Sequence, residues 1–256
     1  MRLHTAVFPV LLFLVGVAAT SGSDHTVVVL PEKPVSRTVK TVEGWTVRVD
    51  DRLLVAPHQE KGSRALALLE AKLADIASVM SLDCLAKCRR VAIVLDLTHG
   101  GLTSMQYHPS AGWLKENGYA EDLAKCVHIP VAARFTDPKH NFIQPWCVLH
   151  ELAHAFHDQV LGFEESRIKQ IWERYVAAGR GTRVLKIDGA KVRHYAMTNH
   201  KEFFAEMSEA YFGTNDFFPF VHGELKESEP ETHALLTEIW GGVAEKQAMP
   251  VQETAQ

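Results

Sequence analysis

The chain has 256 residues, of which 46% are hydrophobic and 23% are charged. This composition is typical of a globular protein with a sizeable core, and it excludes disorder as the main state. Lysine and arginine together number 27, against 31 acidic residues, which gives a formal net charge of −4. Because no basic excess is available to neutralise a phosphate backbone, nucleic acid is not an expected partner.

The N-terminal segment has the pattern of a secretory signal peptide. Arg2 precedes an apolar run over residues 6–19, and small residues follow the run. Cleavage after Ala19, Ser21 or Ser23 would fit, so we predict a signal peptide over residues 1–23 and one domain over residues 24–256. An uncleaved N-terminal anchor is the alternative. No later stretch has the roughly 18 apolar residues of a transmembrane helix, so the mature protein is expected to be secreted or periplasmic and off the membrane.

If the protein is exported, its cysteines are expected to form disulfide bonds. The chain has four cysteines, Cys84, Cys88, Cys126 and Cys147. In an oxidising compartment an even number of cysteines favours disulfide bonds, so two bridges are expected. The sequence does not choose among the three possible pairings. Cys84 can bond Cys88 only if their segment is not a regular helix.

The predicted elements of the mature chain begin with short strands and continue with helices. Strand patterns cover residues 26–30, 45–49 and 53–55, the last two flanking an Asp50-Asp51 turn. A helical pattern follows over residues 63–80, and a continuous β-branched run over 91–97 is typical of a buried strand. Further helices are predicted over residues 144–160, 164–178, 201–212 and 231–240, with a hairpin over 184–192. This order indicates an α+β fold with a small mixed sheet and a helical C-terminal part.

Residues 99–140 are rich in glycine, proline, histidine and aromatic residues, and such long irregular stretches often form binding surfaces. One strand pattern interrupts this stretch, over residues 128–135. If that strand lies exposed at a sheet edge, it could pair with an extended peptide through main-chain hydrogen bonds. No site role is assigned to seven other histidines, which have no second ligand at metal-binding spacing: His99, His108, His128, His140, His194, His200 and His222.

The chemistry of the chain is concentrated in an H-E-x-x-H run at residues 150–154. His150 and His154 are four residues apart, so on a helix both imidazoles lie on one face and can bind one ion at about 2.0–2.1 Å. Glu151 points about 100° away from His150 around the helix. It can therefore reach a water on the ion rather than the ion itself, as a general base requires.

A catalytic zinc site needs a third protein ligand, and spacing alone leaves several candidates open. His157 is close in sequence, but one short helix does not readily supply three ligands. The longer H-E-x-x-H-x-x-G-x-x-H pattern also fails, because His157 stands in place of glycine and Val160 in place of the third histidine. The other candidates are glutamates of the two following helices: Glu164, Glu165 and Glu173 on the first, and Glu202, Glu206 and Glu209 on the second.

A resemblance selects among these candidates. Residues 195–206 read Tyr-Ala-Met-Thr-Asn-His-Lys-Glu-Phe-Phe-Ala-Glu. Together with the H-E-x-x-H run, this stretch resembles the catalytic signature of the anthrax lethal factor family of zinc metallopeptidases. The resemblance covers roughly residues 148–212, and the chain is too short to carry the other domains of the toxin. It implies a zincin-like domain with zinc-site segments over residues 144–160 and 195–212.

The resemblance also implies a role for each matching residue. These roles are zinc ligand for His150, His154 and Glu202, general base for Glu151, hydroxyl donor to the oxyanion for Tyr195, and support of a ligand histidine for Glu206. The sequence therefore predicts a secreted zinc metalloendopeptidase that holds one Zn²⁺ and acts on peptide or protein substrates. A non-catalytic secreted binding protein of the same fold and a zinc hydrolase acting on a non-peptide amide are the alternatives.

Overall fold

The structure is a computed structural model that describes residues 30–241. The predicted signal peptide and most of the predicted strand over residues 26–30 lie outside the described residues. From residue 31 onward the described chain forms one compact unit. None of the helices described in residues 30–241 combines the length and apolar character needed to cross a membrane.

The fold is α+β, as the sequence predicts, and it contains a five-stranded mixed sheet of strand order β1-β2-β3-β5-β4. The β1–β2 and β5–β4 pairs are antiparallel, whereas β2–β3 and β3–β5 are parallel. The strands span β1 Arg37–Val42, β2 Trp45–Asp50, β3 Ile93–Leu95, β4 Gln106–Tyr107 and β5 Val127–Ile129. A separate predicted hairpin is confirmed as β6 Val184–Leu185 and β7 Lys191–Val192.

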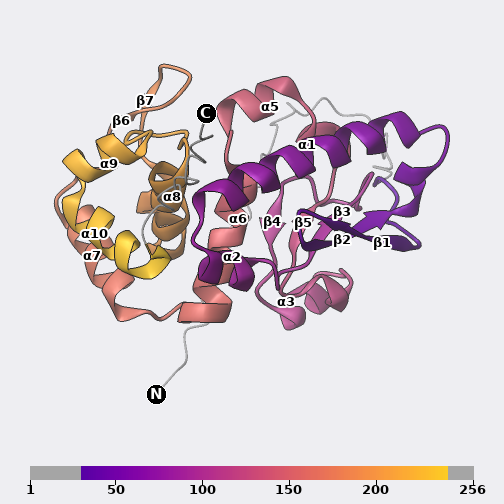
Figure 1. The fold of residues 1–256 in the computed structure, drawn as a ribbon, viewed down its shortest axis with the longest axis horizontal. Coiled ribbons are helices and arrows are strands. Elements are labelled where there is room, and N and C mark those ends of the chain that lie inside the picture. The colour runs from indigo at the N-terminus through magenta and orange to yellow at the C-terminus, as the bar shows by residue number, and fades with distance from the viewer. Residues whose placement is uncertain (1–29, 242–256) are drawn as a thin grey trace, which may run out of the picture. The chain divides into compact units, whose positions relative to one another are not determined.

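Helices connect the strands and make up most of the C-terminal part (Figure 1). Those before the H-E-x-x-H run are η1 Asp51–Leu54, α1 Gln59–Val79, α2 Leu82–Cys88, α3 Ala111–Glu116, η2 Glu121–Leu123, α4 Ala132–Phe135 and α5 Pro138–Ile143. The H-E-x-x-H helix and its continuation are α6 Cys147–Phe156 and the π-helical turn η3 His157–Leu161. The remainder are α7 Ser166–Ala177, η4 Tyr195–Met197, α8 His200–Phe212, α9 His222–Ser228 and α10 Pro230–Trp240.

The predicted hairpin around Asp50 and Asp51 is wrong. β2 pairs instead with β1, through a two-residue turn at Glu43 and Gly44 whose φ angles are +49° and +85°. Positive φ at both turn residues suits the right-handed twist of a hairpin. The Asp50 side chain accepts a hydrogen bond from the Arg52 amide, and this cap starts the 3₁₀-helix η1 where the sequence predicted a strand.

The predicted edge strand over residues 128–135 is also wrong. β5 ends at Ile129, and it lies inside the sheet between β3 and β4 rather than at an edge. Pro130 follows it, and residues 132–135 form the short helix α4. Of the two sheet edges, the one near the H-E-x-x-H helix is β4, which belongs to the region interpreted as irregular.

The predicted disulfide bonds are absent. All four cysteines lie within the described range, and each is a buried free thiol. Cys84 and Cys88 both lie in α2, which is a regular helix, so the geometric condition for pairing them fails. The Cys84 thiol instead donates to the carbonyl of Trp240, 3.5 Å away.

The main core fills the space between one face of the sheet and helices α1 and α6, and it continues between α6 and the C-terminal helices. Figure 1 shows α6 between the sheet on one side and α7–α10 on the other. α8 packs closely against α6, and Gly213 at its end is needed there because a Cβ atom would overlap the Trp146 indole at 1.9 Å. This packing holds the two helices that carry the H-E-x-x-H residues and the glutamates of segment 195–212 at a fixed separation.

Candidate metal centre

The local sequence explains how α6 and α8 present their polar residues. α6 buries Val148, Leu149, Leu152 and Phe156, so it is held by its apolar face. α8 is buried along almost its whole length, and the Asn199 side chain caps it by accepting hydrogen bonds from the amides of residues 201 and 202. The cap fixes the first turn of α8, where Glu202 lies. The carboxylates of α8 are therefore directed into a packed interior and not into solvent.

Three nitrogen and oxygen atoms from these helices form a compact triangle. His150 Nε2 lies 3.1 Å from His154 Nε2 and 3.3 Å from Glu202 Oε2, and His154 Nε2 lies 3.2 Å from the same oxygen. Ligands bound tetrahedrally at about 2.0–2.1 Å from an ion are about 3.3–3.4 Å apart. The triangle therefore has the size that one tetrahedral ion requires.

The three side chains of the triangle are not fully buried. The side chains of His150 and His154 are each 13% exposed, and that of Glu202 is 11% exposed. Three protein ligands with a solvent-facing fourth position are the arrangement of a catalytic rather than a structural metal site. Of the candidate third ligands left open by spacing, the structure brings Glu202 to the two histidines.

The remaining third-ligand candidates have other environments. His157 is fully buried among the rings of Phe163 and Phe204, with centroids 5.3 and 5.0 Å away. The Glu165 carboxylate accepts a hydrogen bond from the Arg167 amide at the start of α7. Glu164 is exposed and paired with Lys169, and Glu173 is exposed on α7.

The nitrogen of His150 that faces away from the triangle is bound to Glu209. His150 Nδ1 lies 2.7 Å from Glu209 Oε1 and 3.8 Å from Glu206 Oε1. A proton on Nδ1 that is donated to Glu209 leaves a lone pair on Nε2, which is the form that binds a metal. The resemblance implied support of a ligand histidine for Glu206; in the structure Glu209, one turn further along α8, makes the shorter contact with His150 and Glu206 lies beside it.

The charges around the triangle fit a cation. Burial and the nearby Asp216 and Glu209 raise the pKa of Glu206 well above its usual value, and burial together with Glu209 raises the pKa of Asp216 to about 7. Burial alone would lower the pKa of His150, but its hydrogen bonds to Glu202 and Glu209 raise it well above 6.5. Raised pKa values for both the buried acids and the histidine are typical of a cluster with an excess of negative charge. A divalent ion bound at the triangle would supply the compensating positive charge.

The two residues predicted to act on the substrate lie beside the triangle. The carboxylate of Glu151 accepts a hydrogen bond from the Tyr107 amide, with 2.6 Å between the nitrogen and Oε2. Burial raises the pKa of Glu151, although the charges of His150 and His154 oppose this. Tyr195 lies in η4, just before α8, and is 47% exposed. Burial and the Glu202 carboxylate raise the pKa of Tyr195 to about 12, which keeps the phenol a hydrogen-bond donor.

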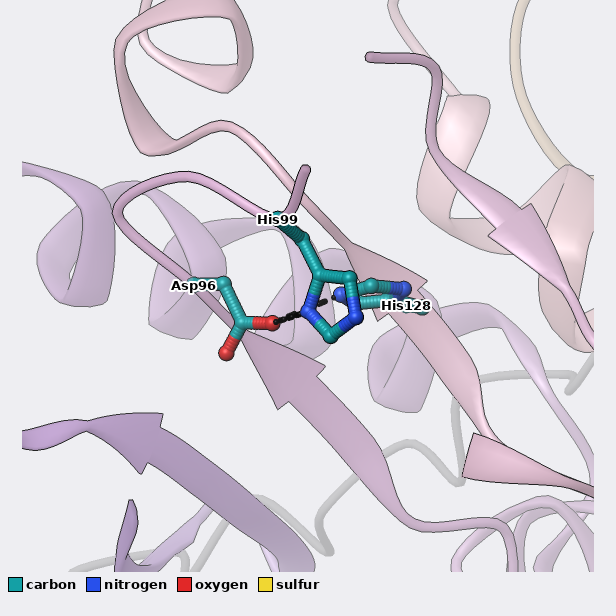
Figure 2. Close-up of side chains that lie close together, drawn as sticks. All are labelled: Asp96, His99 and His128. Carbon is teal, nitrogen blue, oxygen red and sulfur yellow. Dashed lines mark hydrogen bonds and ion pairs between the residues drawn. The ribbon is translucent and has the colours of Figure 1, made fainter. Parts of the chain in front are cut away.

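A second group of metal-binding residue types was missed by the sequence analysis. Asp96, His99 and His128 are all buried, and Figure 2 shows both rings directed at the Asp96 carboxylate. His99 Nδ1 and His128 Nε2 each lie 2.8 Å from Asp96 Oδ2. Asp96 directly follows β3 and His128 lies in β5, so only the pairing of these strands brings the residues together. No spacing in the sequence signals such a group.

In the structure the second group forms a hydrogen-bonded network. The 2.8 Å separations are those of hydrogen bonds and are shorter than the edge of a tetrahedral site. Arg37 already binds both oxygens of Asp96, at 2.7 and 2.8 Å, and neutralises its charge. His108 Nε2 lies 3.2 Å from His128 Nδ1 and extends the network. The Arg37 guanidinium supplies a positive charge, and both Asp96 oxygens already accept hydrogen bonds. We therefore expect no metal ion at this group.

Replacing Asp96 by asparagine is therefore expected to lower stability without changing the metal content. The substitution leaves the Arg37 guanidinium, whose side chain is 14% exposed, without its anion; breaking a fully buried pair costs about 3–5 kcal/mol, which is the upper bound here. Burial would raise the pKa of Asp96, but the hydrogen bonds from Arg37 and His128 lower it well below its usual value. The pair's contribution is thus present above the unfolded-state pKa of about 4 and is lost as the pH falls below it.

Denaturant unfolding and metal analysis of the same samples check this prediction. Asp83→Asn is the matched control, because it removes an exposed ion pair with Lys87 that contributes at most about 1 kcal/mol. A loss of one metal equivalent in Asp96→Asn, with stability unchanged, would show instead that this group binds an ion.

Comparison with known proteins adds no assignment: no family model, no curated protein and no solved structure matches this chain.

Proposed function

We propose that this chain is a secreted zinc metallopeptidase with a zincin-like domain, and that it hydrolyses peptide bonds at the triangle of His150, His154 and Glu202. The observation that supports the proposal most is the combination of that triangle with Glu151 and Tyr195 at its side. Two nitrogens and one carboxylate oxygen are the ligand set of many catalytic zinc sites. A protein that only stored metal would need neither Glu151 nor Tyr195.

The roles of the residues follow from their positions. Zinc, when bound, supplies a Lewis acid that polarises the scissile carbonyl and makes water acidic enough to react near neutral pH. Glu151 takes a proton from the attacking water and then delivers it to the leaving amine. Tyr195 donates its phenol hydrogen to the oxygen that becomes negative in the transition state. Glu209 holds the ring of His150 in the orientation that directs Nε2 to the ion.

The proposal is tested by incubating the zinc-loaded protein with a broad peptide library and reading the products by mass spectrometry. We expect a limited set of internal cuts that disappear when zinc is removed with a chelator and return when it is added back. Zinc binding without any cleavage of the library would favour the non-catalytic binding protein. Hydrolysis of small amides but not of peptides would favour the zinc hydrolase of another amide.

Tyr195→Phe is expected to lower kcat by about 10²–10³-fold while the zinc content stays at the wild-type level. The substitution removes only the hydroxyl, and a donor that meets the oxyanion stabilises the transition state and not the bound metal. Steady-state kinetics on a peptide cleaved in the library, with zinc measured in the same preparation, checks this result. Tyr119→Phe, at a tyrosine on the opposite side of the sheet from α6, is the control. Equal kcat values for Tyr195→Phe and wild type would remove Tyr195 from the mechanism.

A further inference from the structure

The geometry of the edge strand β4 directs one amide towards Glu151. His108, next to β4, bonds the residues just before β5 with both its backbone groups: its amide donates to Cys126 at 3.1 Å and its carbonyl accepts from Lys125 at 2.7 Å. In an antiparallel pair, such residues alternate with residues whose backbone groups point away from the partner strand. The amide of Tyr107 therefore faces outward, and there it donates to Glu151 Oε2 at 2.6 Å.

The side chain of Tyr107 makes a second connection to the same helical segment. Its hydroxyl donates to Asp158 Oδ2 at 2.6 Å and accepts from Gln159 Nε2 at 3.0 Å. Asp158 lies in η3, which directly continues α6, and it also pairs with Lys125. Glu151 and Asp158 are seven residues apart, which is about two helical turns. One residue of β4 thus contacts the H-E-x-x-H helix and its continuation at two points.

Both connections are protected from water. Tyr107 is 6% exposed, and the side chain of Asp158 is 14% exposed. Burial, followed by the hydrogen bond to Asp158, raises the pKa of Tyr107, so the phenol remains the donor. A charge-assisted hydrogen bond at this distance is among the stronger ones that a protein makes. The π-helical turn at η3 is a departure from regular helix of a kind that is frequent at functional sites, and here it carries the acceptor.

We propose that Tyr107 is a positioning residue for Glu151. Its amide fixes one carboxylate oxygen of Glu151, and the bond from its hydroxyl to Asp158 keeps that amide beside the helix. The inference rests on the proposed function, since it assigns Glu151 as the base that is being positioned. With Oε2 held by the amide, Oε1 is the oxygen left to take and deliver the proton. Fixing this carboxylate in advance removes an ordering step from the reaction.

Two variants test the proposal through kinetics. Tyr107→Phe and Asp158→Ala each remove the phenol–carboxylate bond and leave the amide of residue 107 in the chain. We expect kcat to fall by roughly 10- to 100-fold in both, with KM and zinc content unchanged, because only the placement of the base is disturbed. Tyr211→Phe is the matched control, since it also removes one hydroxyl hydrogen bond, to Thr237 at 3.2 Å, away from Glu151. Lower thermal stability with wild-type kcat would show a merely structural role and overturn the proposal.

A second measurement does not depend on activity. In ¹H–¹⁵N spectra of the full mature chain, the amide proton of residue 107 is expected to exchange slowly with solvent and to resonate downfield. Glu151→Ala should speed its exchange and shift it upfield, and Tyr107→Phe should speed its exchange less. An amide at residue 107 that behaves alike in wild type and Glu151→Ala would show that the contact is not formed. If the contact is present but no peptide is cleaved, the proposed function fails and the contact stands.

Discussion

Glu151→Ala is expected to lower peptide hydrolysis by about 10²–10⁴-fold, the usual contribution of a positioned acid or base. The loss falls on kcat, because Glu151 moves a proton only in the reaction and does not belong to the ligand triangle. Zinc content should stay at the wild-type level for the same reason. Single-turnover kinetics with saturating enzyme separates this chemical step from substrate binding.

The control for this experiment is Glu173→Gln, which alters an exposed glutamate on α7 outside the site. It should leave both kcat and zinc content unchanged. Wild-type rates in Glu151→Ala would mean that the cuts come from a contaminating protease or that another group acts as the base.

Glu202→Gln is expected to weaken zinc binding by more than about 100-fold. The substitution replaces the anionic ligand of the triangle by a neutral amide, and loss of an outer-shell partner alone costs about 10–100-fold in metal affinity. His154→Ala should have an effect of the same order, because Nε2 of His154 is the second corner of the triangle. Titration of the zinc-free protein against a competing chelator measures both affinities.

The result for Glu202 also tests the choice of third ligand. If Glu173→Gln releases zinc and Glu202→Gln does not, the ligand lies on α7 and the interpretation based on the lethal factor family fails. Glu209→Gln provides an internal comparison, because its carboxylate touches His150 and not the ion position. Its effect should lie within the 10–100-fold range of outer-shell partners.

The sequence predicted those parts of the fold that depend on local pattern. Helical periodicity predicted α1, α7, α8 and α10 to within a few residues at each end, and the β-branched run predicted β3. The pairing of β1 with β2 was missed because its turn is Glu43-Gly44. Asp50 and Asp51 look like turn residues, but Asp50 caps a 3₁₀-helix and Asp51 begins it. Turn preference alone does not distinguish a cap from a hairpin.

In the candidate site, too, contacts within one helix could be predicted from the sequence, whereas contacts between elements could not. Two histidines four apart are visible in one helix, so His150 and His154 could be read directly from spacing. Glu206 and Glu209 share a face of α8, and which of them meets His150 depends on how α8 is rotated against α6. The Asp96 network joins β3, β5 and the Arg37 side chain of β1, so it exists only once the sheet has formed.

The most direct test of the central claim is anomalous diffraction from crystals of the zinc-loaded protein, measured at the zinc absorption edge. We predict one peak per chain, about 2.0–2.1 Å from His150 Nε2, His154 Nε2 and an oxygen of Glu202. No peak should appear beside Asp96, where Arg37 already holds the carboxylate. A zinc peak at Asp96, His99 and His128, or none at the H-E-x-x-H histidines under saturating zinc, would contradict the account.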